Sequence, residues 1–331
     1  MNSTLLSPDA NKVNAAELNA KVDAAIKKSG SDWDNLPENH ALLKMSAKLG
    51  ELIAEAGYAE MYGVELSAPA EEGKPAPFST LLILQKFLRA NQGQVNKASE
   101  QLLGALKWRK EFKPLQVMKQ VFDKTKFQGL GYVTHLKNVP GSPNDEDIAT
   151  FNVYGAVKDT KKTFGDLDEF IRWRVALMEL TISSLSLSTT STPIPDYTKG
   201  PDPHLAFQIH DYLRVSFLRQ PPEVKAASQA AIKLFTAHYP ETLSVKYFVN
   251  VPLVMQWMFG AMQVFMAKET VAKMQWMSYG EELHKYLGDG VGKAYGGQGP
   301  ELEENSVTPS YEQQRSGDAV ADAAAAKEMA I

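Results

Sequence analysis

Apolar residues recur at helical spacing over roughly the first 125 positions of the chain. In the first such stretch, Leu42, Met45 and Leu49 fall on one broad stripe, and Gly57 follows them as a stop signal. Pro114 closes the last of these stretches. The pattern therefore indicates a helical N-terminal module. The predicted helices are 41–57, 80–90 and 95–112.

The periodicity changes between about residues 128 and 297, where short β-prone runs alternate with amphipathic stretches. Such alternation is typical of βαβ units and predicts a mainly parallel sheet covered by helices, that is, an α/β fold. The predicted strands are 131–136, 150–157, 205–217 and 244–249. The predicted helices are 167–184, 222–238, 252–266 and 268–277. The predicted parts of the chain are a flexible segment, 1–30, the helical module, 31–125, a binding domain, 126–299, and a tail, 300–331.

The composition of the chain excludes several classes of protein but does not identify a binding partner. The net charge of −4 argues against a nucleic-acid binder, which needs clustered Lys and Arg. The chain has no Cys, so disulfides, Cys–zinc sites and thiolate haem ligation are excluded, and a reducing compartment fits best. No apolar run has the length of a signal peptide or a membrane span. We therefore expect a cytoplasmic protein that meets membranes only peripherally.

Common enzyme templates are missing from the sequence. It contains no dinucleotide-binding glycine fingerprint, no phosphate-binding P-loop, no zinc-protease motif and no nucleophile elbow. The six His residues form no metal-ligand spacing. No acid, base and nucleophile set converges, so the sequence predicts a binding protein and not an enzyme.

Short sequence blocks in both halves of the chain resemble motifs of the CRAL-TRIO family and occur in the same order. In the N-terminal module these are 84–90 (LQKFLRA) and 105–109 (ALKWR). The later blocks are 210–212 (HDY), 239–241 (YPE), 246–252 (KYFVNVP) and 295–297 (YGG). The resemblance implies the CRAL-TRIO lipid-binding fold, with a floor of mainly parallel strands, a gating helix and an all-helical N-terminal cap. We expect the Met-rich stretch 252–266 to be the gate, as a soft apolar surface that repacks around a ligand or touches a bilayer.

Within that family the chain is most similar to the fungal phosphatidylinositol transfer proteins that bind haem. The blocks that carry this resemblance are 108–112 (WRKEF), 174–179 (RVALME) and 246–252. The resemblance implies a ferric haem b, with Tyr212 as the axial iron ligand and His210 close to the iron. It also implies haem contacts from Tyr154, Arg174 and Lys246.

The chemistry of these residue types is compatible with that role. Residues two apart on a strand leave the same face, so His210 and Tyr212 point the same way and Asp211 points the other way. A phenolate is a hard anionic ligand that favours ferric iron. Free Tyr titrates near 10, so ligation needs the metal and a nearby positive charge, for which Arg174 is the candidate. Without the resemblance, a Tyr and a His on one strand would be interpreted as hydrogen-bonded core residues.

Two alternative functions remain open from the sequence. The first is phosphatidylinositol exchange without haem, in which Lys273 pairs with the lipid phosphate and Glu241 accepts the inositol hydroxyls. Lipid-exchanging members carry a Gly after the Asp that matches Asp211, and the bulky Tyr212 here favours haem. The second is a peroxide-consuming haem enzyme. Roles in phosphoinositide homeostasis and in haem or oxidant stress would follow from these ligands, and we expect a monomer or a loose dimer.

Overall fold

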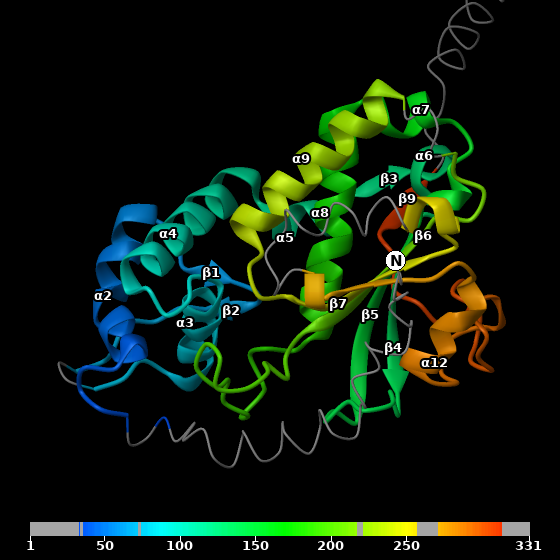
Figure 1. Ribbon diagram of the computed structural model, residues 1–331. Helices are drawn as coiled ribbons and strands as arrows, with labels where there is room; N and C mark the ends of the chain where they lie inside the picture. The colour runs from blue at the N-terminus through cyan, green and yellow to red at the C-terminus, as the bar shows by residue number, and fades with distance from the viewer. Residues whose placement is uncertain (1–32, 34–35, 72–73, 217–220, 257–270, 313–331) are drawn as a thin grey trace, which may run out of the picture.

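The computed structural model describes residues 33, 36–71, 74–216, 221–256 and 271–312. Helices of the N-terminal module lie at one end of the molecule, and a five-stranded sheet with its own helices forms the other end (Figure 1). The predicted α/β fold, with a mainly parallel sheet and a helical module before it, is confirmed.

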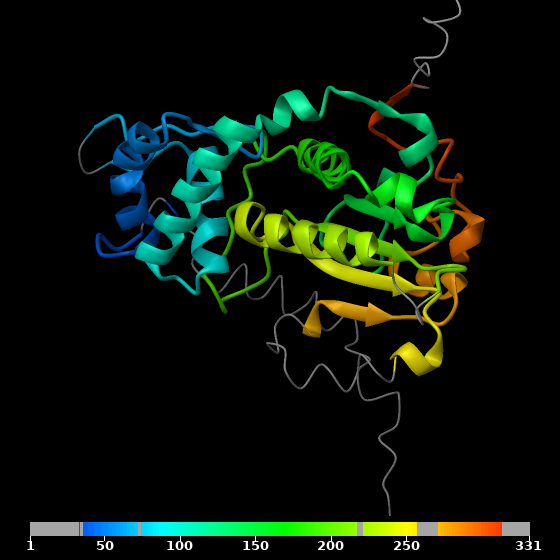
Figure 2. The ribbon, with the colours of Figure 1, turned by 90° about the horizontal axis from the view of Figure 1, so that it is seen from above.

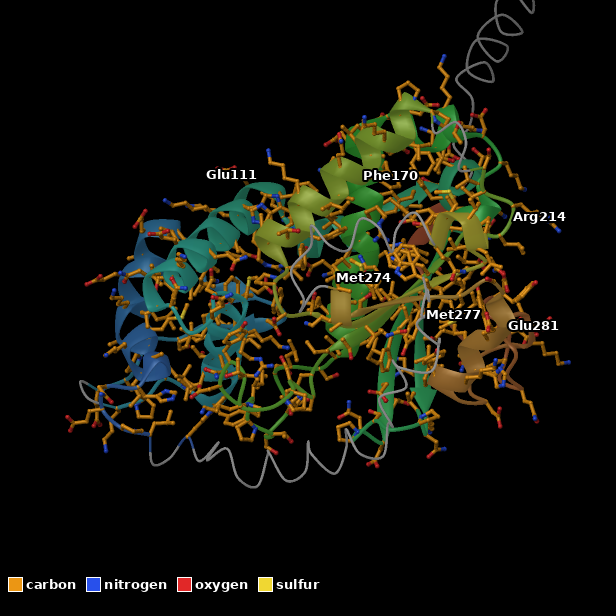
Figure 3. All side chains as sticks on the ribbon, viewed as in Figure 1. Glu111, Phe170, Arg214, Met274, Met277 and Glu281 are labelled. Carbon is orange, nitrogen blue, oxygen red and sulfur yellow. The ribbon has the colours of Figure 1, made fainter. Side chains whose placement is uncertain are left out.

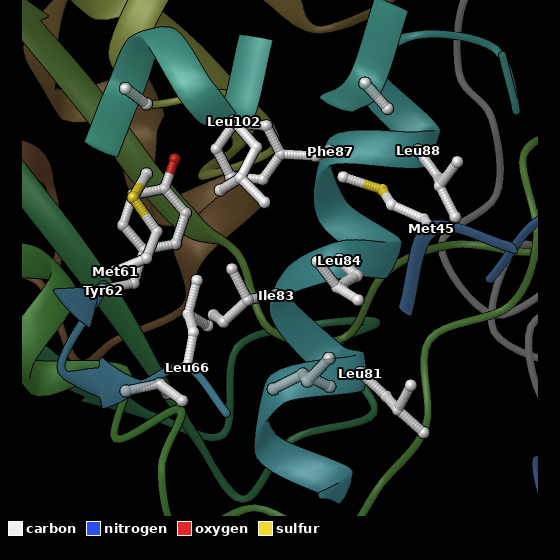
Figure 4. Close-up of a cluster of buried hydrophobic side chains, with 14 of the residues drawn as sticks. Met45, Met61, Tyr62, Leu66, Leu81, Ile83, Leu84, Phe87, Leu88 and Leu102 are labelled. Atoms are coloured by element: carbon white, nitrogen blue, oxygen red, sulfur yellow. The ribbon is translucent and has the colours of Figure 1, made fainter. Parts of the chain in front are cut away.

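Three helices build the N-terminal module at the positions that the hydrophobic pattern predicts. Gly57 adopts the left-handed conformation that ends the first helix, with φ of 62°. Apolar side chains of the second helix fill the centre of the module, with Leu84 and Phe87 fully buried (Figure 4). The same core includes Met178 and Tyr239 of the binding domain, so the two parts share one apolar cluster. The helices are α2 (Ala41–Ala56), α3 (Phe78–Ala90) and α4 (Val95–Phe112).

The expectation of an all-helical cap is wrong in one detail, because the module also contains a short hairpin. Strand β1 (Glu60–Met61) pairs antiparallel with β2 (Val64–Glu65). Tyr62 and Gly63 between them both have positive φ, 58° and 77°, as a two-residue hairpin turn requires. The Tyr62 hydroxyl donates to the carbonyl of Pro240 at 3.1 Å, so the hairpin is tied to the binding domain.

The central sheet has the order β4-β5-β6-β7-β8. Strands β5 to β8 run parallel, and β4 pairs antiparallel with β5 at one edge. Buried Val, Ile, Phe and Tyr side chains alternate between the two faces of the sheet. The strands are β4 (Gly131–Lys137), β5 (Glu146–Val153), β6 (Ala206–Asp211), β7 (Leu243–Val249) and β8 (Met274–Trp276).

Several predicted boundaries differ from the structure. Strand β5 ends at Val153 and leads into the 3-10 turn η3 (Tyr154–Ala156). Strand β6 ends at Asp211, because the Asp211 carboxylate accepts the amide of Leu213 and turns the chain. Of the helix predicted over 268–277, residues 268–270 lie outside the described part and 271–272 are helical, but the prediction is wrong for Met274–Trp276, which form the edge strand β8. Most of the predicted gate, 252–266, lies outside the described residues; within it, 253–256 are helical.

Helices cover both faces of the sheet. Helix α8 (Leu167–Ser184) packs on β4 and β5, and α9 (Pro222–His238) lies against α8 on the same side (Figures 1 and 2). The chain after β8 covers the other face, where Ile209 and Tyr247 are buried. The helical and 3-10 elements there are η5 (Gly280–Leu283), α12 (His284–Leu287) and η6 (Lys293–Tyr295).

The remaining short elements join the chain before the sheet to the chain after it. Strand β3 (Val121–Asp123) pairs parallel with β9 (Ser310–Glu312), and Trp173 Nε1 donates to the Tyr311 hydroxyl at 3.2 Å. In the described part of the chain, no helix is both long and apolar enough to cross a bilayer. The other short helices are α5 (Pro114–Val117), α6 (Lys124–Phe127) and α7 (Thr160–Phe164).

Candidate ligand site

The sheet register places two rows of side chains next to one another on the face that α8 and α9 cover. Along a strand, alternate residues share a face, so residues paired across the sheet form continuous rows. Neither row contains a carboxylate. The first row is Asn152, His210, Phe248 and Trp276, and the second is Thr150, Gln208, Lys246 and Met274.

Aromatic rings gather along the first row and just beyond it. The Tyr154 ring lies 5.5 Å from the His210 ring and 5.3 Å from the Tyr212 ring, measured between centroids. Phe248 lies 5.4 Å from His210 and stacks on Trp276 at 3.9 Å. Tyr154, Tyr212, Phe248 and Trp276 are only half-buried, so this aromatic wall offers apolar surface to a flat or chain-like ligand.

Two cations lie beside the aromatic wall, and neither has a counter-ion in the described part of the chain. Arg174, from α8, is buried; its guanidinium donates to the neutral Oδ1 of Asn152 and lies over the Phe235 ring at 5.4 Å. Burial lowers the pKa of Arg174, and the interaction with Tyr154 raises it by a smaller amount. Burial, followed by the charge of Arg174, lowers the pKa of Lys246 to about 8. Among the described residues no carboxylate acts on either cation, so this part of the site carries an excess of positive charge.

His210 is a buried neutral imidazole in the middle of this group. Burial, followed by the charges of Lys246 and Arg174, lowers its pKa well below the usual range. Its Nε2 has no hydrogen-bond partner in the described residues. A buried ring nitrogen without a partner is uncommon in proteins and is consistent with a ligand that approaches it.

Tyr212 lies one residue past the end of β6, but its backbone still follows the sheet. Its amide donates to the carbonyl of Val249 at 3.1 Å, and its ring reaches the same neighbours as His210. The sequence argument from strand alternation therefore holds for the side chain, although the strand ends earlier than predicted. Burial, followed by Tyr154, raises the pKa of the Tyr212 phenol above its usual value, so the phenol is neutral in the protein alone.

Asp211 points to the opposite face, as the alternation predicts, and fixes the loop that carries Tyr212. Its carboxylate accepts the Tyr295 hydroxyl at 3.0 Å and the Asn250 amide at 2.7 Å. Asn250 in turn accepts the amide of Gly280 at 2.7 Å. These bonds hold together the carboxyl ends of β6 and β7 and the start of η5.

The five residues that the sequence assigns to a haem site thus lie together. We name Tyr154, Arg174, His210, Tyr212 and Lys246, with the ring of Phe248, the cation–aromatic face. The sequence missed Phe248, which is one of many aromatic residues in the chain, and Asn152, a lone Asn on a strand. Only the register of the sheet places these two residues beside the predicted ones.

Glu241 and Lys273, the predicted headgroup pair, lie near one another at the amino end of β7. The Glu241 carboxylate is 4.0 Å from Lys273 Nζ and 3.7 Å from Arg89 Nε, so two cations already neutralise it. Figure 3 shows Met274, the neighbour of Lys273, near the middle of the molecule, while Arg214, beyond Tyr212, lies at the far edge. This pair and Tyr212 therefore lie at opposite ends of the strands.

Two other features of the described residues were compared with the cation–aromatic face: a surface cavity and clusters of metal-ligating side chains. A cavity of about 1090 Å³ lies between β4 and residues 288–307 and contains none of the predicted site residues. It is lined by charged and polar groups such as Lys137, Glu146 and Asp289, so it lacks the aromatic surface of the cation–aromatic face. Among the described residues, no group of three or more His, Cys, Asp or Glu side chains could hold a metal ion.

The lowered pKa of Lys246 predicts a specific pH dependence. A base with a folded pKa near 8 and an unfolded pKa near 10.4 binds more protons in the unfolded state between these values, so stability rises with pH there. Below pH 8 the full cost of the buried ammonium is present. We expect Lys246→Met to raise the melting temperature at pH 7 and to remove the rise between pH 8 and 10. Melting curves at each pH unit, with and without the substitution, check this; parallel curves for the two proteins would contradict it.

Comparison with known proteins identifies the family to which this fold belongs. Residues 151–297 match the CRAL/TRIO domain. A protein from Phaeosphaeria nodorum named phosphatidylinositol transfer protein SFH5 is 49% identical over 87% of this chain and 86% of its own length. A protein of the same name from Cryptococcus neoformans var. neoformans serotype D is also 49% identical, over 82% of this chain and 91% of its own.

A solved structure shows the same architecture. The crystal structure of Sfh5 superposes with a TM-score of 0.67 at 27% identity, and the match covers 92% of this chain and 98% of the other. The resemblance derived from the sequence blocks is thereby confirmed. The chain belongs to the CRAL/TRIO family and is closely similar to its members named phosphatidylinositol transfer protein SFH5.

Proposed function

We propose that this protein is a phosphatidylinositol transfer protein that also binds one haem b on its cation–aromatic face. The observation that carries the proposal is the pair Arg174 and Lys246, which lies next to an aromatic wall and has no carboxylate counter-ion among the residues that the structure describes. Desolvated cations are costly unless an anion accompanies them. A ligand that is apolar over most of its surface and anionic at one edge would satisfy both halves of the face.

Haem fits these residues in three respects. Arg174 and Lys246 would hold the propionates, because both are cations that have no ionic partner among the described side chains. Tyr154 and Phe248 would flank the ring. Tyr212 would ligate the iron, with the neutral His210 imidazole close by. When bound, ferric haem supplies a Lewis-acid iron whose charge favours a phenolate oxygen.

The phenol of Tyr212 sets a condition on this proposal. Burial raises its pKa in the protein alone, so ligation must overcome the cost of a buried anion. The positive potential of Arg174 and Lys246 would reduce that cost, because a phenolate enters a region with excess positive charge. His210 stays neutral and its unpartnered Nε2 would remain available close to the ligand.

Phosphatidylinositol is the second cargo that we propose, and the names of the related proteins support it. The inositol phosphate would meet Lys273 and Arg89, while Glu241 would accept inositol hydroxyls at the amino end of β7. Because Glu241 is already paired with both cations, headgroup binding would exchange these ion pairs for contacts with the lipid. Exchange of phosphatidylinositol without haem is the alternative.

We assign the protein no catalytic activity, and we propose that it acts in the cytoplasm with peripheral contact to the endoplasmic reticulum or other intracellular membranes. The family relatives are named as carriers, and a carrier must visit the bilayers that hold its lipid. A peroxide-consuming haem enzyme would reveal itself as rapid loss of peroxide when purified protein is added. We expect only the slow reaction that free haem gives.

The absorption spectrum of the protein purified without added cofactor tests the proposal. We expect a Soret band from bound ferric haem, together with iron in about equimolar amount by elemental analysis. Lipid extracted from the same sample and identified by mass spectrometry tests the second cargo. A colourless protein that carries phosphatidylinositol would refute haem binding and move the site to Glu241 and Lys273.

A further inference from the structure

Asn152 holds Arg174 in place with a neutral side chain. The Asn152 side chain is almost fully buried, with 1% of its surface exposed, in the row that contains His210. Its Oδ1 accepts a hydrogen bond from Arg174 Nη1, and its Nδ2 donates to the carbonyl of Ile209 at 3.3 Å. The second bond fixes which end of the amide faces the guanidinium, because only the Oδ1 end can accept.

The neutrality of this acceptor is unusual for a buried Arg. Elsewhere in the described chain, buried Arg109 is paired with two carboxylates, and buried Lys86 is paired with Asp202 at 2.7 Å. Charged groups inside proteins are normally paired in this way. At Arg174 the position of the partner is occupied by an amide, which orients the guanidinium but does not compensate its charge.

We propose that Asn152 is a positioning residue that determines the charge specificity of the cation–aromatic face. It orients Arg174 through one hydrogen bond while it leaves the Arg174 and Lys246 pair positive, so that the face selects ligands with an anionic group. This inference rests on the proposed function, in which such a ligand is the cargo. A carboxylate of the same shape at position 152 would pair with Arg174 and remove the selectivity.

The substitution Asn152→Asp tests the inference with two ligands of nearly the same shape. Haem carries two propionates, whereas haem dimethyl ester carries none. We expect Asn152→Asp to weaken haem binding by at least about 30-fold, since truncating or neutralising one partner of a buried charge pair costs about 2 kcal/mol or more. Binding of the dimethyl ester should weaken less than that of haem, because the ester has no propionates and loses only the support that Arg174 gives to the Tyr212 phenolate. Asn305→Asp, which adds the same charge at an exposed position, is the matched control and should leave both affinities unchanged.

Each outcome decides the inference. Equal haem affinity of the wild type and Asn152→Asp would overturn it. Equal weakening of haem and of the ester would also overturn it, because that result indicates a merely structural role. Asn152→Ala, which removes the acceptor without adding charge, should reduce haem affinity less than Asn152→Asp does; the reverse order would contradict charge as the cause.

A wild-type protein that binds neither haem nor its ester would refute the proposed haem function and leave the inference testable. In that case dodecyl phosphate and the uncharged octaethylene glycol dodecyl ether replace the two ligands, and the melting temperature is the measurement. If the anionic amphiphile stabilises the wild type more than the neutral one, and Asn152→Asp abolishes this difference, the inference stands. If the two amphiphiles act alike on the wild type, it fails.

Discussion

Replacing Tyr212 with Phe is expected to remove most of the haem from the purified protein and to abolish the spectrum of its ferric tyrosinate. The change deletes one oxygen and keeps the ring. The centroid of this ring lies 5.3 Å from that of Tyr154 and 6.4 Å from that of Phe248, and these ring contacts should survive. Substituting groups that only support metal ligands typically costs 10–100-fold in affinity. Loss of the ligand itself should therefore cost about 100-fold or more, measured by haem titration.

Tyr154→Phe is the matched control for this prediction. It removes the same atom from the neighbouring ring and should leave the position of the Soret band unchanged. In Tyr212→Phe, any haem that remains should show a shifted band, because the Nε2 of His210, which has no hydrogen-bond partner in the described residues, is an alternative iron ligand. Full haem content with the wild-type spectrum in Tyr212→Phe would rule out Tyr212 as the iron ligand.

The largest loss of stability is expected from Arg109→Met. Arg109 is fully buried and donates to Glu60 and Glu179, each at 2.7 Å, and Glu179 also accepts the Tyr239 hydroxyl. Burial lowers the pKa of Arg109, but Glu179 and Glu60 outweigh this effect and keep it charged. The substitution leaves the buried Glu179 without its counter-ion, which typically costs about 3–5 kcal/mol. Urea unfolding of the two proteins measures the difference.

Lys107→Met on the same helix is the comparison for Arg109→Met. Lys107 pairs with Glu55 at 2.7 Å, but both side chains are about half exposed, so water screens the pair and its loss should cost less than about 1 kcal/mol. Equal destabilisation by the two substitutions would mean that helix α4 and not the buried charge network determines the effect.

Most elements of the fold could be predicted from residue spacing, and the failures have physical causes. Helices α4 and α8 match their predicted ranges because their apolar faces keep a helical period over 18 residues. Residues 274–276 were predicted as helix because such a short run carries little periodicity of its own. Their strand conformation comes from pairing with β7 and from the stack of Trp276 on Phe248, which are far away in the sequence.

In the candidate site too, some residues could be predicted from the sequence and others depend on contacts between distant parts of the chain. Tyr212 and His210 could be found because a resemblance singled them out and strand alternation placed them on one face. Asn152 could not be found, since its role depends on an Arg from helix α8 that reaches the strand only in the folded protein. The pairing of Glu241 with Arg89 could not be predicted either, because the two residues are more than 150 positions apart in the sequence.

The shared contacts between the N-terminal module and the sheet affect how the chain can be divided for experiments. Lys86, on α3, is fully buried and donates to Asp202 and to the carbonyls of His204 and Glu241. A fragment that contains only the matched residues 151–297 would expose these acceptors, together with Glu179, to solvent without their cations. Such a fragment should express as an aggregating or partly folded protein, so ligand measurements on a shortened chain require a fragment that begins before α2.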